Sequence, residues 1–391
     1  MPAPRLAGFS AMLLSTMGLS TFAFFAIAVA GSQIEAEFGI TKLELGLLGA
    51  INTLVGGLLA PKAGQLSDRF GGRTAMGATL GLSALSAAAI ALSTSYGVLL
   101  AAMALAGLPQ GMGNPACNKA IADGIAEAKR GVLTGIKQSG VQTAVFATGF
   151  AVPWLTAEFG WRSSMWVLAA VSTIALLGIR LIPVAERDER KEDATARSTQ
   201  PLPMFVNQVA IYGFLLGIVG GGLGRFLPLF AEEEVGFTLE QAGRVFGVQG
   251  LIAIPTRLAS GAALDRGVSA RVMLTVMGIF GGISVLLILA ATGGASAFLW
   301  VGTVLGGMTL GAWNTAANLS MIRQPDAGRA TGRLILGFLI GLTVGGPLVG
   351  VSIDNFGYSP AWIASAVLAM TGAAVIARRP ADPQPSVTLN T

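Results

Sequence analysis

Long apolar stretches alternate with short polar connections along almost the whole chain. A helix that spans a membrane needs about 20 predominantly apolar residues, and the pattern predicts twelve such helices. They cover residues 8–33, 43–63, 74–95, 97–122, 131–156, 163–183, 205–231, 239–263, 271–291, 296–321, 329–352 and 359–377. The first stretch is too long for the apolar core of a secretion signal, so we interpret it as a spanning helix.

The second half of this pattern repeats the first at a fixed spacing. Adding 197 to the position carries one set of glycines and polar residues onto another: Gly64, Asp68 and Arg69 onto Gly261, Asp265 and Arg266, and Gly131, Thr134 and Gly135 onto Gly328, Thr331 and Gly332. A duplicated chain of apolar helices is typical of secondary transporters, whose substrate site lies between the repeats. We expect an N-terminal six-helix bundle at 1–183, a polar cytoplasmic linker at 184–204, a C-terminal six-helix bundle at 205–378 and a cytoplasmic tail at 379–391.

Composition and charge agree with a membrane protein. Hydrophobic residues make up 53% of the chain and charged residues 12%, whereas soluble domains carry roughly 25% charge. Lys and Arg concentrate on alternate connections, which predicts that both termini and the linker lie in the cytoplasm, in a bacterial-type inner membrane. The basic pI of about 9.7 follows from this bias. No basic stripe with stacking aromatics accompanies it, so we expect no nucleic-acid partner.

Residue usage argues against an enzyme. The chain has no histidine and one cysteine, Cys117, and its 20 acidic residues fall in connections or near predicted helix ends. We therefore expect no metal site, no cofactor and no disulfide. An enzyme would need a nucleophile with a base or a set of metal ligands, and neither is visible. A receptor on the same scaffold, binding a ligand without moving it, stays open as an alternative that flux assays would separate.

The connection between the second and third predicted helices carries a recognisable motif. Its sequence Gly64-Gln-Leu-Ser-Asp68-Arg69-Phe-Gly71-Gly-Arg73 resembles the G-x-x-x-D-R-x-G-R-R signature of the major facilitator superfamily, with one Gly in an Arg place. A truncated copy follows in the second half. The resemblance covers essentially the whole chain and implies an all-α fold of twelve helices in two pseudo-symmetric halves that rock about a central site. It also implies a cytoplasmic gate, for which the candidates are Gly64, Asp68, Arg69, Gly71, Arg73, Gly261, Asp265 and Arg266.

The residues of this connection suggest two roles by themselves. Gly64 permits close approach of helices, and Asp68 is placed where a carboxylate can cap a helix N-terminus. The alternative is a turn that only sets the topology.

Amide side chains form stripes on two predicted helices. Gln110, Asn114 and Asn118 recur at intervals of four and so share one face of the fourth helix, while Asn314 and Asn318 do so on the tenth. An unpartnered amide in hydrocarbon costs free energy, so we interpret the stripes as cavity lining. Hydrogen bonding between helices is the alternative. Trp313 is predicted either as an aromatic wall of the site or as a packing residue.

Cations inside predicted helices give the clue to the substrate. Lys137, Arg225 and Arg257 lie there, as does Arg333 nearer the cytoplasm. A cation in the membrane normally faces a cavity or a counter-charge. Because no acidic residue is available at that depth, an anionic substrate is the expected partner. Alternatively, Lys137 and Arg333 reach the cytoplasmic surface, Arg225 pairs with the Glu232–Glu234 cluster, and Arg257 pairs with Asp265.

Arg257 is the strongest single candidate. The sequence Arg257-x-x-x-Gly261-x-x-x-Asp265 resembles the helix-eight pattern of monocarboxylate and oxalate carriers, which implies that this arginine binds a substrate carboxylate. A guanidinium suits that role because it donates two parallel hydrogen bonds. The helix-eleven lysine of oxalate carriers has no counterpart here.

The expected function is the transport of a small organic anion by alternating access, by a monomer in the bilayer. A coupling proton or a counter-anion would drive it. The rival is a broad-specificity exporter of apolar drugs, favoured by small and Met residues in the cavity helices. Two missing family patterns count against the rival. The antiporter signature of the fifth helix, G-x-x-x-G-P-x-x-G-G, is not recognisable around residues 140–153. In the fourth helix, Gly107 stands where many proton-coupled members have the arginine of an R-x-x-Q-G motif.

Overall fold

In a computed structural model, residues 3–124, 127–181, 202–324 and 326–378 are described. The tail expected at 379–391 and almost all of the linker expected at 184–204 lie outside these residues. The boundaries proposed for them stay predictions.

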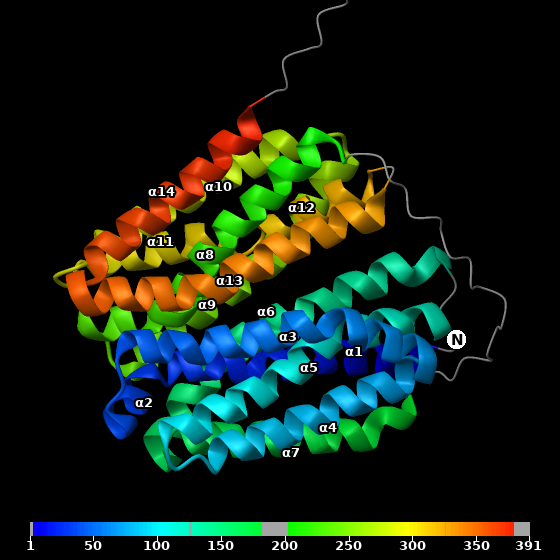
Figure 1. Cartoon of the computed structure of the whole chain (residues 1–391), viewed down its shortest axis with the longest axis horizontal. Coiled ribbons are helices and arrows are strands. Elements are labelled where there is room, and N and C mark those ends of the chain that lie inside the picture. The colour runs from blue at the N-terminus through cyan, green and yellow to red at the C-terminus, as the bar shows by residue number, and fades with distance from the viewer. Residues whose placement is uncertain (1–2, 125–126, 182–201, 325, 379–391) are drawn as a thin grey trace, which may run out of the picture.

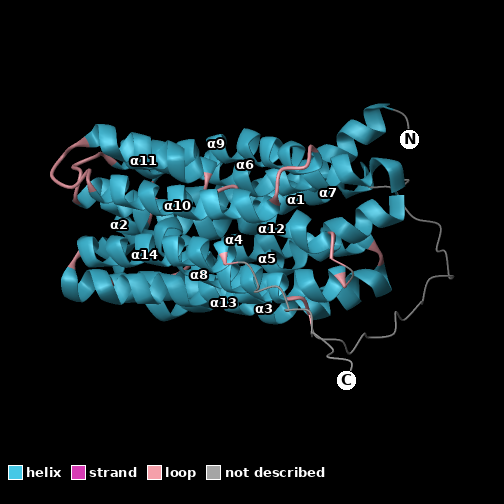
Figure 2. Cartoon of the chain, turned by 90° about the horizontal axis from the view of Figure 1, so that it is seen from above, coloured by secondary structure: helices cyan, strands magenta, loops and turns pink. Residues whose placement is uncertain are grey.

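The first half of the chain forms seven helices and a short 3-10 turn. They are α1 (Ala3–Val29), α2 (Gly31–Phe38), α3 (Lys42–Phe70), α4 (Gly72–Ala91), α5 (Tyr96–Gly124), α6 (Glu127–Phe159), α7 (Arg162–Leu177) and η1 (Gly178–Leu181). The second half forms α8 (Met204–Glu233), α9 (Leu239–Asp265), α10 (Ala270–Leu289), α11 (Ser296–Met308), α12 (Trp313–Ile322), α13 (Ala327–Phe356) and α14 (Tyr358–Ala377). All described elements are helices, which lie alongside one another (Figure 2).

The predicted all-α membrane fold is confirmed. Nine segments of the described chain are long and apolar enough to cross a membrane, and α6, α7 and α9 bring the set to the twelve helices expected. Two expectations need correction. The first predicted helix, 8–33, ends at Val29, where α2 follows as a separate helix. The tenth predicted helix, 296–321, is not continuous. It breaks between α11 and α12, at Thr309–Ala312.

The repeat seen in the sequence is also a repeat of local structure. Gly39 and Gly236 have φ of +63° and +78°, a conformation that favours glycine. Two residues later, Thr41 and Thr238 each accept a hydrogen bond from the backbone three residues ahead and close a capping box. These devices begin α3 and α9 in the same way, as the pseudo-symmetry of the two halves requires.

Glycines set the closest helix contacts. A side chain at Gly111 of α5 would overlap the backbone of Gly56 in α3, and one at Gly341 of α13 would overlap the backbone of Phe214 in α8. In a bilayer, burial from water does not drive helices together. Close backbone approach through small residues is therefore a main source of attraction.

The two halves meet at one end of the molecule and diverge toward the other (Figure 1). We call the end where α3 and α9 begin the closed end and the other the open end. Near the closed end, Gly46 of α3 abuts Gly346 of α13, and Gly149 of α6 abuts Gly243 of α9. Toward the open end, a Cβ added at Gly332 of α13 would meet nothing within 4 Å.

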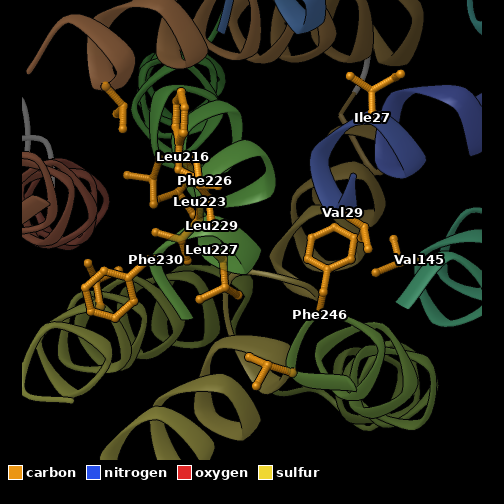
Figure 3. Close-up of a cluster of buried hydrophobic side chains, with 14 of the residues drawn as sticks. Ile27, Val29, Val145, Leu216, Leu223, Phe226, Leu227, Leu229, Phe230 and Phe246 are labelled. Atoms are coloured by element: carbon orange, nitrogen blue, oxygen red, sulfur yellow. The ribbon is translucent and has the colours of Figure 1, made fainter. Parts of the chain in front are cut away.

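One apolar core runs along the second half and continues into the first half near the closed end. Figure 3 shows Val29 of α1 and Val145 of α6 beside Phe246 of α9, with Leu227 of α8 nearby. The ring of Phe25, also from α1, lies 6.0 Å from that of Phe246. A separate core serves the open end of the first half. The halves therefore share side-chain packing mainly at the closed end.

Polar contacts between the halves also gather at the closed end. The Lys42 ammonium lies 2.6 Å from Glu35 in its own half and 2.5 Å from Glu233 in the other. The Asp354 carboxylate of α13 accepts hydrogen bonds from the backbone amides of Lys42 and Leu43, at 2.9 and 2.8 Å. A carboxylate of one half thus caps the N-terminus of a helix in the other, where the helix dipole favours negative charge.

Candidate functional site

Lys137 is buried inside the first half. Its side chain is 1% exposed, and its Nζ donates to Asn114 Oδ1 at 2.6 Å and to Asn118 Oδ1 at 2.5 Å. The alternative that Lys137 reaches the cytoplasmic surface is wrong. Because both amide oxygens face the ammonium, the Nδ2 groups remain free to donate elsewhere. Two predicted stripe residues and one predicted cation therefore form one cluster.

Arg257 lies on α9 beside the break in the tenth helix. Its Nε donates to the Gly311 carbonyl at 2.9 Å. Its two Nη atoms meet no acceptor among the described residues. Asp265, the alternative partner, is paired with Arg323 at 2.8 Å instead. Irregular backbone at membrane depth occurs where it is buried or lines a cavity, so the break and Arg257 together mark the candidate site.

Arg225 lies apart from the other two cations. It is eight residues from the end of α8, or about 12 Å from the closed end, whereas Arg257 is 18 residues into α9, about 27 Å from that end. The sequence grouped them in one site, and the structure separates them by roughly 15 Å along the helices. The alternative pairing of Arg225 with Glu232–Glu234 is not seen, because Glu232 accepts from Ser32 and Glu233 pairs with Lys42.

The remaining predicted residues have local partners. Trp313 is 4% exposed and packs edge-on against Tyr212 and Phe338, with ring centroids 5.5 Å away in both cases. The burial of Trp313 supports the prediction that it is a packing residue and does not support the prediction that it forms the wall of a cavity. Asn318 donates to the backbone oxygen of Asn314 one turn earlier. The Gln110 Oε1 is buried with no donor among the described residues.

The motif between α3 and α4 is arranged differently from the capping role suggested for Asp68. Asp68 and Arg69 are exposed on the last turn of α3, and Gly71 has φ of +84°. The amide that begins α4, on Gly72, donates to Asp123 Oδ2 at 2.9 Å. Asp123 of α5 therefore takes the position that sequence reasoning gave to Asp68. The only hint was an acidic residue at the end of the fourth predicted helix.

The other gate residues are also toward the open end. Arg73 is half-buried, Arg266 is exposed, and Gly64 has open space beside it. A Cβ at Gly261 would meet only Leu319 of its own half, at 3.8 Å. The gate residues of the two halves are therefore not in contact in this conformation.

Sequence reasoning missed the polar cluster at the closed end, because its acidic residues sit in a short helix and at helix ends. Burial raises the pKa of the Glu35 carboxyl above its ordinary value, although the ammonium of Lys42 opposes this; Glu233 and Asp354 add to the rise. By contrast, the hydrogen bond from Arg162 lowers the pKa of Glu37.

Two further features are the Cys117 thiol and an apolar groove. Cys117 is a free, fully buried thiol whose Sγ lies 3.9 Å from the Leu13 carbonyl oxygen. A groove between α3 and α13 is lined by side chains such as Leu47, Leu54 and Leu348 and has no charged residue. It does not include any of the predicted site residues.

Comparison with known proteins identifies the family. The model of the Major Facilitator Superfamily matches residues 12–327. The fold is similar to the crystal structure of a bacterial homologue of the human lysosomal transporter Spinster, in an inward-facing and occupied conformation. The TM-score is 0.79 at 15% identity, over 96% of this chain and 97% of that one.

Curated relatives are bacterial transport proteins. The chain is 26% identical to an uncharacterized transporter, YybO, of Bacillus subtilis (64% of this chain, 63% of the relative) and 28% identical to the nitrite extrusion protein of the same organism (63% and 62%). It is 22% identical to the cis,cis-muconate transport protein of Acinetobacter baylyi (56% and 59%). The matches thus span less than two thirds of each relative. The chain belongs to the major facilitator superfamily and is a multi-pass membrane protein.

Proposed function

We propose that this protein carries a small organic anion, a carboxylate, across a bacterial inner membrane by alternating access. The proposal rests on the hydrogen bonding of Arg257. Its Nε is fixed on the Gly311 carbonyl, and both Nη atoms are left without an acceptor among the described residues. A carboxylate is the partner that such a planar pair of donors fits best.

Nothing acidic competes for this arginine at its depth in the described chain. Every Asp and Glu that the structure describes lies in a connection, in the short α2, or in the first or last turn of a longer helix. A guanidinium at membrane depth without a counter-charge is costly. An anion that enters from the cavity supplies the missing charge.

The cluster of Lys137, Asn114 and Asn118 supports the same substrate. Two of the three ammonium hydrogens are directed at amide oxygens, and neutral oxygens leave the positive charge uncompensated. Asn118 is exposed, so its free Nδ2 group can donate to an anion backed by the lysine. The names of two relatives, a nitrite extrusion protein and a cis,cis-muconate transport protein, also point to anions.

We assign the closed end to the outside, with both termini in the cytoplasm, because the basic connections lie at the open end. The structure then corresponds to a carrier open to the cytoplasm. Rocking of the halves would bring the Asp68 and Asp265 connections together and close that side. The coupling partner is a proton or a counter-anion.

Uptake of cis,cis-muconate and of nitrite into proteoliposomes tests the proposal. We expect Arg257→Gln to lower muconate transport at least about tenfold, because charge-assisted hydrogen bonds to the carboxylate are lost. The matched control is Arg244→Gln on the same helix, an exposed residue paired with Glu240. Unchanged muconate transport in Arg257→Gln would contradict the assignment. Transport of lipophilic cations, with no anion transport, would favour the drug exporter.

A further inference from the structure

Arg225 reaches from the second half of the protein into the first. It belongs to α8, yet its guanidinium lies over the ring of Phe24 in α1, 5.0 Å from the ring centroid. It also packs against Gly49 of α3, where any Cβ would overlap Nη2. Phe24 and Gly49 form a socket for Arg225, built entirely from the opposite half.

This socket leaves the charge of Arg225 without a hydrogen-bonding partner. The side chain is 1% exposed, and neither Nη atom has an acceptor among the described residues. A buried ion without an acceptor is strongly unfavourable. The face of Phe24 compensates only in part, since a cation over an aromatic ring gains less than an ion pair with hydrogen bonds.

The position of the socket indicates in which conformation Arg225 can bind an acceptor. It lies about 12 Å from the closed end, where the halves are in contact. If the halves part at this end, Phe24 and Gly49 withdraw together with their half. The guanidinium then faces the opening that forms, with its planar pair of donors free.

We propose that Arg225 is a separate anion site, used when the closed end is open, and that Phe24 and Gly49 replace the anion as that end closes. The inference rests on the proposed function, since it takes the same carboxylate as the ligand. The transport path then contains two anion sites about 15 Å apart along the helices. Arg225 binds the anion when the closed end is open, and Arg257 binds it when the open end is open. Because the ring of Phe24 replaces the anion, the affinity of the Arg225 site falls as the Arg257 site becomes accessible.

Sided kinetics test this division. Uptake of cis,cis-muconate would be measured in intact cells, which present the proposed outer end, and in inverted membrane vesicles, which present the open end. We expect Arg225→Met to raise the half-saturation concentration in cells about tenfold or more, because charge-assisted hydrogen bonds are lost. In inverted vesicles, where Arg257 meets the substrate first, it should change less than about twofold.

Further variants separate a site from a structural role. Arg225→Lys keeps the charge and should restore part of the affinity in cells. Phe24→Leu keeps most of the volume but removes the ring face, and should lower the half-saturation concentration in cells while slowing turnover. A thermal unfolding transition of purified Arg225→Met establishes that it folds.

The outcomes distinguish this inference from the proposed function. If the wild-type protein does not move muconate, the proposed function fails, and the inference fails with it. If the wild type transports but Arg225→Met raises the half-saturation equally on both sides, one common site exists and only the inference fails. If neither side changes, Arg225 does not contact the anion.

Discussion

At the scale of single residues, two of the cations inside the described helices, Lys137 and Arg257, are held by neutral oxygens. Lys137 donates to two asparagine side chains and Arg257 to a backbone carbonyl. Carboxylates in these places would have stabilised the folded protein and cancelled the charge. Neutral acceptors orient each cation and leave its electric field intact, which is what capture of an anion requires.

Replacing Asn114 by Asp tests this reading. Asn114→Asp places a carboxylate on Lys137, so we expect the apparent unfolding temperature to rise by a few degrees. Because the same change cancels the local positive charge, binding of muconate should weaken about tenfold. The control is Asn355→Asp, an exposed residue that donates only to its own helix, at Val351. A stabilised protein with unaltered muconate affinity would remove the Lys137 cluster from the site.

The cations themselves could be predicted from the sequence, but their partners could not. A lysine and an arginine within apolar stretches are visible by inspection. Whether Arg257 meets Asp265, a ligand or a carbonyl depends on where the tenth helix breaks. No proline lies at the break, and the Nε of Arg257 bonds to a carbonyl there. The continuous helix predicted at 296–321 was therefore the natural expectation.

At the scale of elements, close helix crossings carry the packing. Gly341→Ala would push a methyl group into the backbone of Phe214, so we expect a loss of about 1–3 kcal/mol in the free energy of unfolding. Gly332→Ala, on the same helix but in open space, should be neutral or stabilise by up to about 1 kcal/mol. Thermal unfolding in detergent compares the two. Equal effects would show that the α8–α13 crossing has room to separate.

The elements were predictable because a bilayer fixes their length. Apolar stretches predicted the position of each spanning helix, with most ends a few residues from those observed, but the stretches at 8–33 and 296–321 each cross a break between two helices. Their pairing was not predictable in detail. Which glycines touch, and that Asp123 rather than Asp68 meets the start of α4, depends on tertiary contacts between segments distant in sequence.

At the scale of the whole molecule, the closed end should respond to pH. Glu35 faces Lys42 of its own half and Glu233 and Asp354 of the other, and burial raises its pKa above the ordinary 4.5. If opening exposes Glu35 and returns its pKa toward 4.5, the closed form binds the proton more tightly. Acidification through the raised pKa therefore favours closure, and the effect levels off below 4.5.

Spin labels at Ser95→Cys and Thr292→Cys, exposed positions of opposite halves at the closed end, can follow this equilibrium. We expect the population with the shorter distance to grow as the pH falls toward 4.5. Glu35→Gln, which cannot titrate, should flatten the response. A response that persists in Glu35→Gln would assign it to another group.

The burial of Cys117 has a practical consequence for such work. The chain carries a single thiol, which is fully buried on α5, with its Sγ next to the Leu13 carbonyl oxygen of α1. Because it is buried in this conformation, we expect thiol reagents in solution not to react with it while the protein is folded. A cysteine introduced at the surface should therefore be the residue that reacts with the label. The natural sequence can then serve as the background for spectroscopic probes, and Cys117 does not have to be replaced first.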